Sequence, residues 1–411
     1  MNIWIFQTGE PLHCDDSNYR PMRAINLSNK LIEAGHDVVL WSSSFNHQDK
    51  AHRSKKYKVI RQNNNLEIRL IPSRGYQKHI GFDRLIDHVQ LAWNLKKILK
   101  VEKTIPDVVF IGYPPIETAA VMSRWLKERK VPTLLDVKDL WPSIFVDAFP
   151  AILSPIVRIL FHPYFYFAKR TIRDVDGIST MSLGFLNWCL SFADKSKGVN
   201  DRVVRLTTLN SEANISELSS AELWWSELGV NPDGPKVFFT GTFSTAFDFN
   251  QIYIAAKSIN SCQFILCGHG PCLDQVKELM RDLPNVIFPG WIDRFQMESL
   301  ANMSLATLAP YKNVKNFTLN IPNKIVDSLL LGLPILSPLT GEVESLISNR
   351  KVGFTYNNNN PLASCIQSLV DDDKLQNLMS INAKRLYEEE FEFNKVYGGL
   401  VDHLEGMVIK K

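Results

Sequence analysis

The sequence predicts an α/β protein with two domains, each built on a parallel sheet that helices cover on both faces. Three observations support this prediction. Short apolar segments alternate with longer segments of helical periodicity along most of the chain. The alternation begins at residue 1 and begins again near Lys236. The length of 411 residues accommodates two domains of ordinary size, each large enough to bury its own core.

The first half holds six predicted strands, each a short run rich in branched or aromatic side chains. They cover residues 2–6, 37–41, 66–71, 107–111, 133–137 and 177–180. Helices are expected over residues 19–34, 82–100 and 116–129, where apolar residues recur at helical spacing. For the first helix, Ser17 or Asn18 is the expected N-cap and Gly35 the expected stop.

The second half repeats this pattern. Strands are predicted over 236–240, 263–267, 286–288, 305–308 and 333–336, with helices over 250–258, 272–283 and 295–302. Two such sets of similar size indicate two Rossmann-like domains that face each other. The expected domains are residues 1–200 and 201–393, joined through a polar linker within 194–233. That linker contains the Pro-Asp-Gly turn at 232–234.

A last helix is expected over about 394–409, with an apolar stripe formed by Val396, Leu400, Leu404 and Val408. Such a stripe needs a surface to bury against. Packing of the C-terminal segment 394–411 back onto the first domain is the expected solution, and pairing with another chain is the alternative.

Composition and charge exclude several classes of protein. A formal net charge of +3 is too small for a nucleic-acid-binding face, so no nucleic acid partner is expected. The six cysteines form no CxxC pair and no zinc-type cluster, which is typical of a reducing compartment. No run approaches the roughly 20 apolar residues of a membrane span. The N-terminal stretch 1–6 reads as a strand and not as a signal peptide, so a cytoplasmic location is expected.

Residues 321–338, IPNKIVDSLLLGLPILSP, combine a loop, a short helix and a buried strand. Pro322 suits the first helical turn. Asn323 and Lys324 then lie where helix N–H groups, the helix dipole and a lysine charge favour an anion. Asp327 follows in the same helix, and Gly332 ends it. This pattern predicts a diphosphate at the helix start and a ribose at Asp327. The alternative is an ordinary helix-to-strand turn with a surface lysine.

A second polar cluster, Asp136, Lys138 and Asp139, lies at the end of the predicted strand 133–137. The ends of strands in open parallel sheets face the crevice in which ligands bind. An ionised Asp139 can polarise a substrate hydroxyl. Helix capping by Asp139 is the alternative.

Six motifs follow one another along nearly the whole chain. They are KLIEAGHDVVLWSSSFNH at 30–47, LLDVKDLWP at 134–142, GISTMS at 177–182, FFTGTF at 238–243, LCGHGP at 266–271, and the PNK…D…G…P block at 322–334. In this order and spacing they resemble the GT-B glycosyltransferases of the large retaining family four, nearest to bacterial surface-polysaccharide enzymes of the O-antigen type. The resemblance implies that a nucleotide sugar binds the second domain, across a cleft from an acceptor held by the first.

The resemblance also implies a donor site made of the helix start and two loops. Its residues are Gly241, Thr242, Phe243, Gly268, His269, Gly270, Asn323, Lys324 and Asp327. Many relatives place an arginine and a lysine after the strand 236–240, where this chain has Thr242 and Phe247. Backbone amides of 241–243 and the Lys324 charge are therefore expected to hold the diphosphate. The family's earlier glutamate corresponds to Leu319, which leaves sugar contact to nearby polar residues: Asn316, Thr318 or Asn320.

In the first domain, Asp139 and Lys138 are the candidate catalytic residues. Arg20 and Arg23 are the candidate acceptor-binding residues, because guanidinium groups match phosphate oxygens. A solvated helix turn is the alternative for the two arginines. His13 and His47 are expected to be ordinary loop histidines.

Residues 151–173 combine many aliphatic and aromatic side chains with Lys169, Arg170 and Arg173. An aromatic face beside a basic cluster fits shallow insertion into anionic headgroups. A buried helix pair is the alternative.

These observations favour a glycosyltransferase that moves a hexose or an N-acetylhexosamine from a nucleotide sugar, expected to be UDP-linked, to a lipid-diphosphate-linked glycan. Its place is expected in surface-polysaccharide biosynthesis, such as that of O-antigen or lipopolysaccharide, on the inner face of the cytoplasmic membrane. No acidic pair for a metal stands out, so metal-independent transfer without a cofactor is expected. The resemblance implies retention of anomeric configuration. The alternatives are a nucleotide-sugar epimerase of the same fold and a non-catalytic partner subunit.

Overall fold

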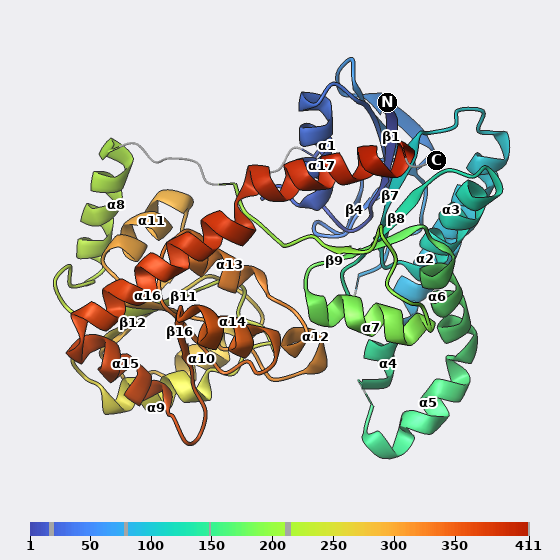
Figure 1. Cartoon of the computed structure of the whole chain (residues 1–411). Helices are drawn as coiled ribbons and strands as arrows, with labels where there is room; N and C mark the ends of the chain where they lie inside the picture. Colours follow the sequence, from blue (N-terminus) through green and yellow to red (C-terminus); the bar gives the residue numbers. More distant parts are fainter. Residues whose placement is uncertain (16–19, 78–80, 148, 210–214, 410–411) are drawn as a thin grey trace. The chain divides into compact units, whose positions relative to one another are not determined.

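The computed structural model describes residues 1–15, 20–77, 81–147, 149–209 and 215–409. The chain forms two compact units (Figure 1). Unit 1 comprises Met1–Val204 together with Asn394–Lys411, and unit 2 comprises Arg205–Phe393. The chain therefore leaves unit 1 once and returns to it for the C-terminal segment. The predicted boundary after residue 200 lies four residues before the observed one, after residue 204.

Unit 1 is built on an eight-stranded sheet in the order β10-β9-β8-β7-β1-β2-β6-β5. Every pairing is parallel except that of β5 with β6. From β1 the chain runs outward through β2 and β6, and then on the other side through β7, β8 and β9. The topological switch point therefore lies between β1 and β7. The strands are β1 (Asn2–Phe6), β2 (Asp37–Ser43), β5 (Lys58–Arg61), β6 (Leu66–Ile71), β7 (Val108–Tyr113), β8 (Thr133–Val137), β9 (Gly177–Thr180) and β10 (Arg202–Val203), with a separate hairpin of β3 (Phe45–Asn46) and β4 (Ala51–His52).

Helices cover this sheet and share its core. Trp4 of β1 lies between Trp41 of β2 and Trp125 of α3, at ring-centroid distances of 5.1 and 5.7 Å. Helix α3 packs against both α2 and α6 (Figure 1). The helices are α1 (Arg23–Glu33), α2 (Phe82–Val101), α3 (Ile116–Glu128), α4 (Ser143–Asp147), the 3-10 turn η1 (Ala151–Leu153), α5 (Ser154–Leu160), α6 (His162–Asp174), α7 (Leu183–Ala193) and α17 (Phe393–Ile409).

Two helices of unit 1 differ from the prediction. Helix α1 begins at Arg23, later than expected, and the predicted caps Ser17 and Asn18 lie outside the described residues. Gly35 follows α1 with a φ of +83°, as a left-handed stop requires. In α17 the buried face is wider than the predicted stripe: it includes Tyr397, Leu400, Val401, Leu404 and Met407, while Val396 and Val408 are only partly buried.

Helix α17 is fixed within unit 1 by polar contacts as well as by its apolar face. The Tyr397 hydroxyl accepts a hydrogen bond from the Asn26 amide of α1 at 3.3 Å, and Glu405 pairs with His36 at 2.8 Å. These contacts join the C-terminal helix to the residues around α1, and Figure 1 shows the two helices side by side.

Unit 2 has a six-stranded, wholly parallel sheet in the order β13-β12-β11-β14-β15-β16. Its switch point lies between β11 and β14. The strands are β11 (Lys236–Thr240), β12 (Gln263–Cys267), β13 (Val286–Gly290), β14 (Ala306–Leu308), β15 (Ile335–Ser337) and β16 (Gly353–Thr355). The helices are α8 (Ile215–Glu227), α9 (Asn250–Ser258), α10 (Leu273–Leu279), α11 (Arg294–Asn302), α12 (Lys315–Thr318), α13 (Asn323–Leu330), α14 (Glu342–Arg350), α15 (Leu362–Asp371), α16 (Asp373–Leu386) and the π-helical turn η2 (Tyr387–Phe391).

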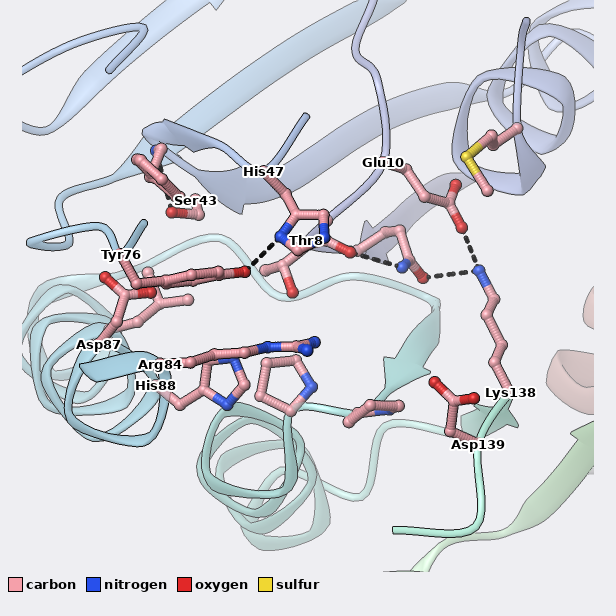
Figure 2. A pocket seen from close by; sticks show the side chains of 17 residues that line it. Thr8, Glu10, Ser43, His47, Tyr76, Arg84, Asp87, His88, Lys138 and Asp139 are labelled. Atoms are coloured by element: carbon pink, nitrogen blue, oxygen red, sulfur yellow. Dashed lines mark hydrogen bonds and ion pairs between the residues drawn. The ribbon is translucent and has the colours of Figure 1, made fainter. Parts of the chain in front are cut away.

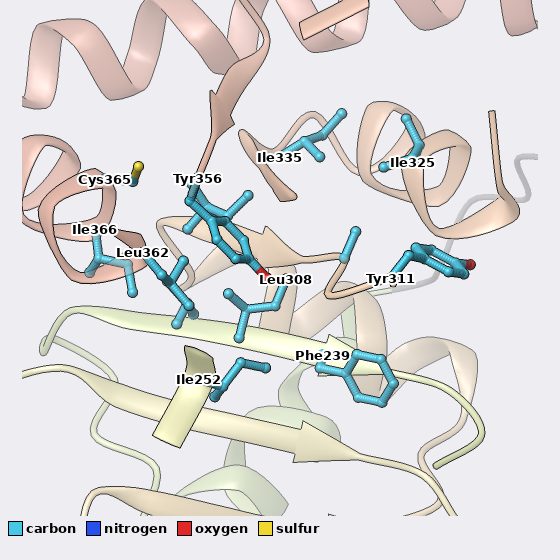
Figure 3. Close-up of a cluster of buried hydrophobic side chains, with 14 of the residues drawn as sticks. Phe239, Ile252, Leu308, Tyr311, Ile325, Ile335, Tyr356, Leu362, Cys365 and Ile366 are labelled. Carbon is cyan, nitrogen blue, oxygen red and sulfur yellow. The ribbon is translucent and has the colours of Figure 1, made fainter. Parts of the chain in front are cut away.

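The main core of unit 2 lies around the switch point (Figure 3). Phe239 of β11, Leu308 of β14 and Ile325 of α13 are all buried in it. Removing apolar surface from water favours this packing by roughly 25 cal/mol per Å² buried. The core thereby holds the end of β11 and the start of α13 in a fixed arrangement.

The predicted linker is partly wrong. Residues 194–233 include β10, which pairs within unit 1, and helix α8 of unit 2. Trp225 of α8 is buried beside Phe238 and Ile265, and its indole N–H donates to the Gln296 carbonyl oxygen at 2.9 Å. These Trp225 contacts hold helix α8 against unit 2, within a segment that the sequence analysis assigned to a linker.

Candidate active site

In unit 2 the loops after β11 and β12 are bonded directly to one another. The Gly241 N–H donates to the Cys267 carbonyl oxygen at 3.0 Å, and the Phe243 N–H donates to the His269 carbonyl oxygen at 2.8 Å. A Cβ at Gly268, whose φ is +130°, would overlap with the Gly241 carbonyl group. The glycine in this loop thus permits the close approach of two backbones.

These contacts correct part of the predicted donor site. The N–H groups of Gly241 and Phe243 already have backbone acceptors, so they are not the diphosphate donors that the sequence predicted. The Phe243 side chain is buried against Phe239 and Phe249. Gly270 has the same packing role as Gly268, since a Cβ there would overlap with Phe243 backbone atoms.

Three predicted donor residues of these loops and the helix start are differently placed. Thr242, His269 and Asn323 all have exposed side chains. Asn323 is the first residue of α13, where helix N–H groups have no partner within the helix.

Lys324 lies at the end of β11, on the edge of the sheet where ligands bind in such folds. Its ammonium donates to the Thr240 carbonyl oxygen. It also lies 4.6 Å from the ring centroid of Phe239 and 5.2 Å from that of Phe247. Phe247, at a position where the resemblance implied a charged residue, therefore forms part of an aromatic support for the Lys324 charge.

Asp327 lies one helical turn further along α13 and is half-buried. Its carboxylate accepts a hydrogen bond from the Thr208 hydroxyl at 3.0 Å. The Thr208 carbonyl oxygen in turn accepts from the Tyr387 hydroxyl at 2.7 Å. Burial, together with the nearby Asp327 carboxylate, raises the pKa of Tyr311. Asp327 is thus held by a short polar chain within unit 2.

The three residues predicted to contact the sugar in place of the family's earlier glutamate differ in burial. Asn320 is buried, and its side-chain oxygen accepts from the Ile321 N–H at 2.8 Å, which is a turn-stabilising role. Asn316 and Thr318 lie in the short helix α12 and are partly exposed, as is Leu319.

Unit 1 contains a cavity of about 190 Å³ at its own switch point (Figure 2). Four strand ends contribute to it. Residues 7–10 follow β1, Ser43 ends β2, residues 114–115 follow β7, and Lys138 and Asp139 follow β8. The two predicted catalytic residues therefore both line one cavity, at the edge of the sheet where ligands are expected.

Lys138 is held by a charged network beneath this cavity. Its ammonium pairs with the Glu10 carboxylate and donates to the Gln7 side-chain oxygen at 3.2 Å. It also lies 3.7 Å from Asp136. Glu10 is fixed because its second oxygen accepts from the Ala24 N–H of α1 at 2.9 Å. Figure 2 shows Asp139 beside Lys138, facing the cavity.

Asp136 and Arg23 are structural partners and do not line the cavity. Asp136 is fully buried and accepts from the Ser179 hydroxyl at 2.8 Å. The Arg23 guanidinium is also buried, lies 3.4 Å from Asp136 and donates to the Val204 carbonyl oxygen at 2.9 Å. This placement argues against the predicted role of Arg23 in binding an acceptor phosphate. Arg20 is exposed before α1.

Several cavity residues were missed in the sequence. Arg84, Asp87 and His88 come from one face of α2, and His47 and Tyr76 come from loops after β3 and β6. Figure 2 shows Arg84 lying between Tyr76 and His88 and pointing into the cavity. The polar i, i+3, i+4 spacing on a helix with apolar neighbours was the available signal.

Burial determines the pKa values of the residues that line this side of the cavity. His47 is bonded to the Tyr76 hydroxyl at 2.5 Å, so it is more than the loop histidine expected. Burial raises the pKa of Asp87, although the Gly75 N–H that it accepts opposes the rise. Burial, with help from Arg84 and His47, lowers the pKa of His88 to about 3. His88 is therefore neutral at ordinary pH.

Helices α5 and α6, with η1 before them, expose most of their apolar side chains. Ile152 is 85 % exposed, Ile159 74 % and Leu160 72 %, so the buried helix pair considered for this segment is wrong at these positions. Among the residues of this segment whose side chains are described, the buried apolar ones are Val157, Ala168 and Ile172. Within the described residues, no helix is long and apolar enough to cross a membrane.

The two sheets, their switch points and the arrangement of helices are those of GT-B glycosyltransferases, and solved structures bear this out along the whole chain. Sucrose-phosphate synthase from Thermosynechococcus elongatus is similar over 100 % of both chains, with a TM-score of 0.73 and 14 % identity. HepE from Anabaena, solved in complex with UDP, is similar over 98 % of this chain and 99 % of its own, with a TM-score of 0.64 and 14 % identity. WaaG, a glycosyltransferase involved in lipopolysaccharide biosynthesis, is similar over 99 % and 100 %, with a TM-score of 0.64 and 12 % identity.

Residues 234–372 match the family described as "Glycosyl transferases group 1". Among curated proteins, no sequence match was found. The family match and the shared GT-B fold together support a glycosyltransferase. All nine predicted donor-binding residues lie within the matched segment.

Proposed function

We propose that unit 2 binds a nucleotide-sugar donor and that unit 1 binds a lipid-linked saccharide to which the sugar is transferred. One observation carries the donor half of this proposal: the family match over 234–372 encloses a helix start whose lysine lies at the switch point of the sheet. A helix N-terminus with an adjacent ammonium is suited to a diphosphate.

At the donor site, Asn323 and Lys324 would meet the diphosphate through helix N–H groups and the Lys324 charge. Thr242 and His269 are the loop residues exposed near the same sheet edge. Asp327 accepts hydrogen bonds and would take them from a ribose diol in addition to Thr208. Stabilisation of the leaving diphosphate by Lys324 and the helix start is the basis for proposing metal-independent transfer.

At the acceptor site, Asp139 would accept a hydrogen bond from the reacting hydroxyl. The positive charge of Lys138 would offset the negative charges in the cavity. The cavity is small and is lined by both charged and apolar side chains, which suits a sugar ring better than a lipid chain. Asp139 needs to be ionised for this role.

The exposed α5–α6 segment suggests how a lipid-linked acceptor reaches unit 1. Ile152, Ile159 and Leu160 project from it, and Lys169, Arg170 and Arg173 follow in α6. Apolar side chains beside basic ones favour shallow insertion among anionic headgroups. We therefore propose peripheral contact with the inner face of the cytoplasmic membrane.

Retention of configuration, a UDP-linked donor and a role in surface-polysaccharide biosynthesis belong to the same proposal. They rest on the sequence motifs and on the nature of two similar proteins, HepE with its bound UDP and WaaG with its role in lipopolysaccharide biosynthesis. The hexosyl or N-acetylhexosaminyl group and the acceptor linkage are left to experiment.

A thermal-shift panel of nucleotides and nucleotide sugars identifies the donor, because a ligand that binds the native state raises its melting temperature. The stabilising donor is then incubated with polyprenyl-diphosphate-linked glycans. Nucleotide release that depends on the acceptor supports transfer. Interconversion of donor sugars without an acceptor would instead identify an epimerase. Neither activity, with tight binding of another transferase, would identify a partner subunit.

A further inference from the structure

Behind the wall of the unit 1 cavity lies a pair of titratable side chains that the proposed function does not use. His88 of α2 lines the cavity, whereas Glu117 of α3 does not. The His88 Nδ1 atom lies 3.9 Å from the Glu117 Oε2 atom. Both atoms are buried and have no hydrogen-bond partner. A movement of about 1 Å brings them to hydrogen-bond distance.

The other oxygen of Glu117 is already fixed. The Tyr164 hydroxyl of α6 donates to Glu117 Oε1. The carboxyl group is thereby held with Oε2 toward His88. Because Nδ1 faces Glu117, the opposite edge of the His88 ring, which carries Nε2, is the edge that faces the cavity.

We propose that Glu117 is a positioning residue that sets the tautomer of His88, and through it the hydrogen bond that His88 offers to the acceptor. The proposal rests on the proposed function, since it assigns the acceptor to this cavity. When Glu117 is protonated, its hydroxyl donates to Nδ1 and the cavity meets Nε2–H. When Glu117 is ionised, it accepts from Nδ1–H and the cavity meets the lone pair of Nε2.

The pKa of Glu117 places the change of His88 tautomer within an experimentally accessible pH range. Burial raises the pKa of Glu117 to about 7, with Asp87 adding to the rise and Arg84 opposing it. His88 stays neutral because burial, Arg84 and His47 lower its pKa. The titratable and charged groups that face the pair are Tyr164 from α6, Tyr113 from β7, Arg84 and Asp87 from α2, Tyr76 from the loop after β6, and His47 from the β3–β4 turn.

The preferred tautomer follows from the neighbours of His88. Arg84 lies on the same wall and offers only donors. A sugar hydroxyl whose oxygen accepts from Arg84 has its own hydrogen left to donate, and it needs a lone pair opposite. The ionised state of Glu117 provides that lone pair on Nε2. Acceptor binding is therefore expected to strengthen as pH rises through about 7.

The first test reads the tautomer without any substrate. In ¹⁵N-histidine spectra of the full-length protein, the His88 signals, assigned with a His88→Asn variant, should exchange Nε2–H for Nδ1–H between pH 6 and pH 8.5. The Glu117→Gln variant should hold Nε2–H at both pH values, because the amide can donate to Nδ1 but cannot ionise. A His88 tautomer that is the same at both pH values in the unmodified protein overturns the proposal.

The second test reads function. The KM for the acceptor should fall several-fold between pH 6 and pH 8.5, with kcat and the donor KM following their own trends. In Glu117→Gln this fall should be lost, leaving the acceptor KM several-fold higher than that of the parent protein at pH 8.5. Glu128→Gln, on the exposed end of α3, is the matched control and should retain the fall. A Glu117→Gln variant that keeps the fall in KM overturns the proposal.

A second pair of variants covers the case in which Glu117→Gln does not fold. Tyr164→Phe removes the hydroxyl that stabilises ionised Glu117, so the tautomer midpoint should move to higher pH. Tyr166→Phe changes an exposed residue of the same helix and should leave it in place. An unmoved midpoint in Tyr164→Phe contradicts the proposed geometry. If the tautomer changes as expected but no transfer occurs with any acceptor, the proposed function fails and the Glu117–His88 coupling stands.

Discussion

The switch points of the two units share one topology and differ in what they present there. In unit 1, four strand ends and α2 bring charged side chains into a cavity, including Lys138, Asp139 and Arg84. In unit 2, the loops after β11 and β12 are closed onto each other through backbone hydrogen bonds and glycines, and Lys324 lies at the edge. Strand order thus determines where a ligand site lies, whereas the residues after each strand determine whether side chains or a helix start supply its chemistry.

The largest expected effect comes from a substitution in the charged cavity of unit 1. Asp139→Asn keeps the size of the side chain and removes its charge, so transfer should fall by about 10²–10⁴-fold with donor affinity nearly unchanged. Steady-state kinetics and donor titration measure the two quantities. Asp282→Asn, an exposed carboxylate of unit 2, is the control. Near-normal turnover in Asp139→Asn would assign the residue to helix capping instead.

The closed loops of unit 2 predict a loss of stability. Gly268→Ala places a methyl group against the Gly241 carbonyl group at a φ of +130°, so the variant should lose about 2–4 kcal/mol in the free energy of unfolding of unit 2. Denaturant unfolding followed by far-UV circular dichroism measures this loss. Gly406→Ala in α17, where a Cβ meets open space, should be neutral or slightly stabilising. Equal stability of Gly268→Ala and the parent protein would show that the two loops can separate.

A further prediction concerns how the stability of unit 1 changes with pH. Burial raises the pKa of Glu117, so the native state keeps its proton between the ordinary pKa of 4.5 and about 7 while the unfolded state loses it. The Glu117 contribution to stability therefore falls as pH rises through that window. Glu117→Gln lacks this loss, so relative to the parent it should gain about 2 kcal/mol of unfolding free energy between pH 5 and pH 7.5. A constant difference between the two proteins at all pH values would mean that Glu117 has an ordinary pKa.

The helix start of unit 2 is tested by charge removal. Lys324→Ala should weaken binding of a nucleoside diphosphate about tenfold or more and binding of the nucleoside much less, because charge-assisted hydrogen bonds contribute about 1.5–3 kcal/mol. Isothermal titration with both ligands makes the comparison. Lys277→Ala, on the exposed face of α10, serves as the matched variant. Equal losses for the two ligands would indicate a disturbed fold.

The smallest expected effect concerns the surface of unit 1. Ile159→Asn with Leu160→Asn removes two exposed apolar side chains and should lower binding to vesicles of anionic phospholipid several-fold. Ile381→Asn changes another exposed isoleucine, on α16 of unit 2, and should have no such effect. Vesicle co-sedimentation measures both. Unchanged sedimentation of the double variant would remove the α5–α6 segment from the membrane proposal.

The sequence predicted the strands better than the site, for identifiable reasons. The segment 108–111 within the predicted strand 107–111 is apolar on both faces, so it is recognisable as part of a central strand of a parallel sheet without knowledge of its neighbours. Helix α8 was missed because it lies between polar stretches and was assigned to the linker, whereas in the structure Trp225 is buried in unit 2 and the helix packs against α11.

The site residues that sequence reasoning found are those that directly follow a strand, such as Lys138 and Asp139. Those it missed, Arg84 and His88, reach the cavity from a helix, and no local pattern states which strand end that helix packs beside. Arg23 was misassigned because a buried arginine bonded to Asp136 and an exposed one have the same sequence signature.

The return of the chain to unit 1 has a consequence for the order of folding during synthesis. Helix α17 buries Leu400 and Leu404 and bonds to residues around α1, so unit 1 lacks a helix until residues 394–409, which follow unit 2 in the chain, have left the ribosome. Unit 2, by contrast, is a continuous segment and can close its core as soon as it emerges. A polypeptide that ended before residue 394 would carry a complete unit 2 and a unit 1 without α17, so we expect proteolysis of such a fragment to attack unit 1 before unit 2.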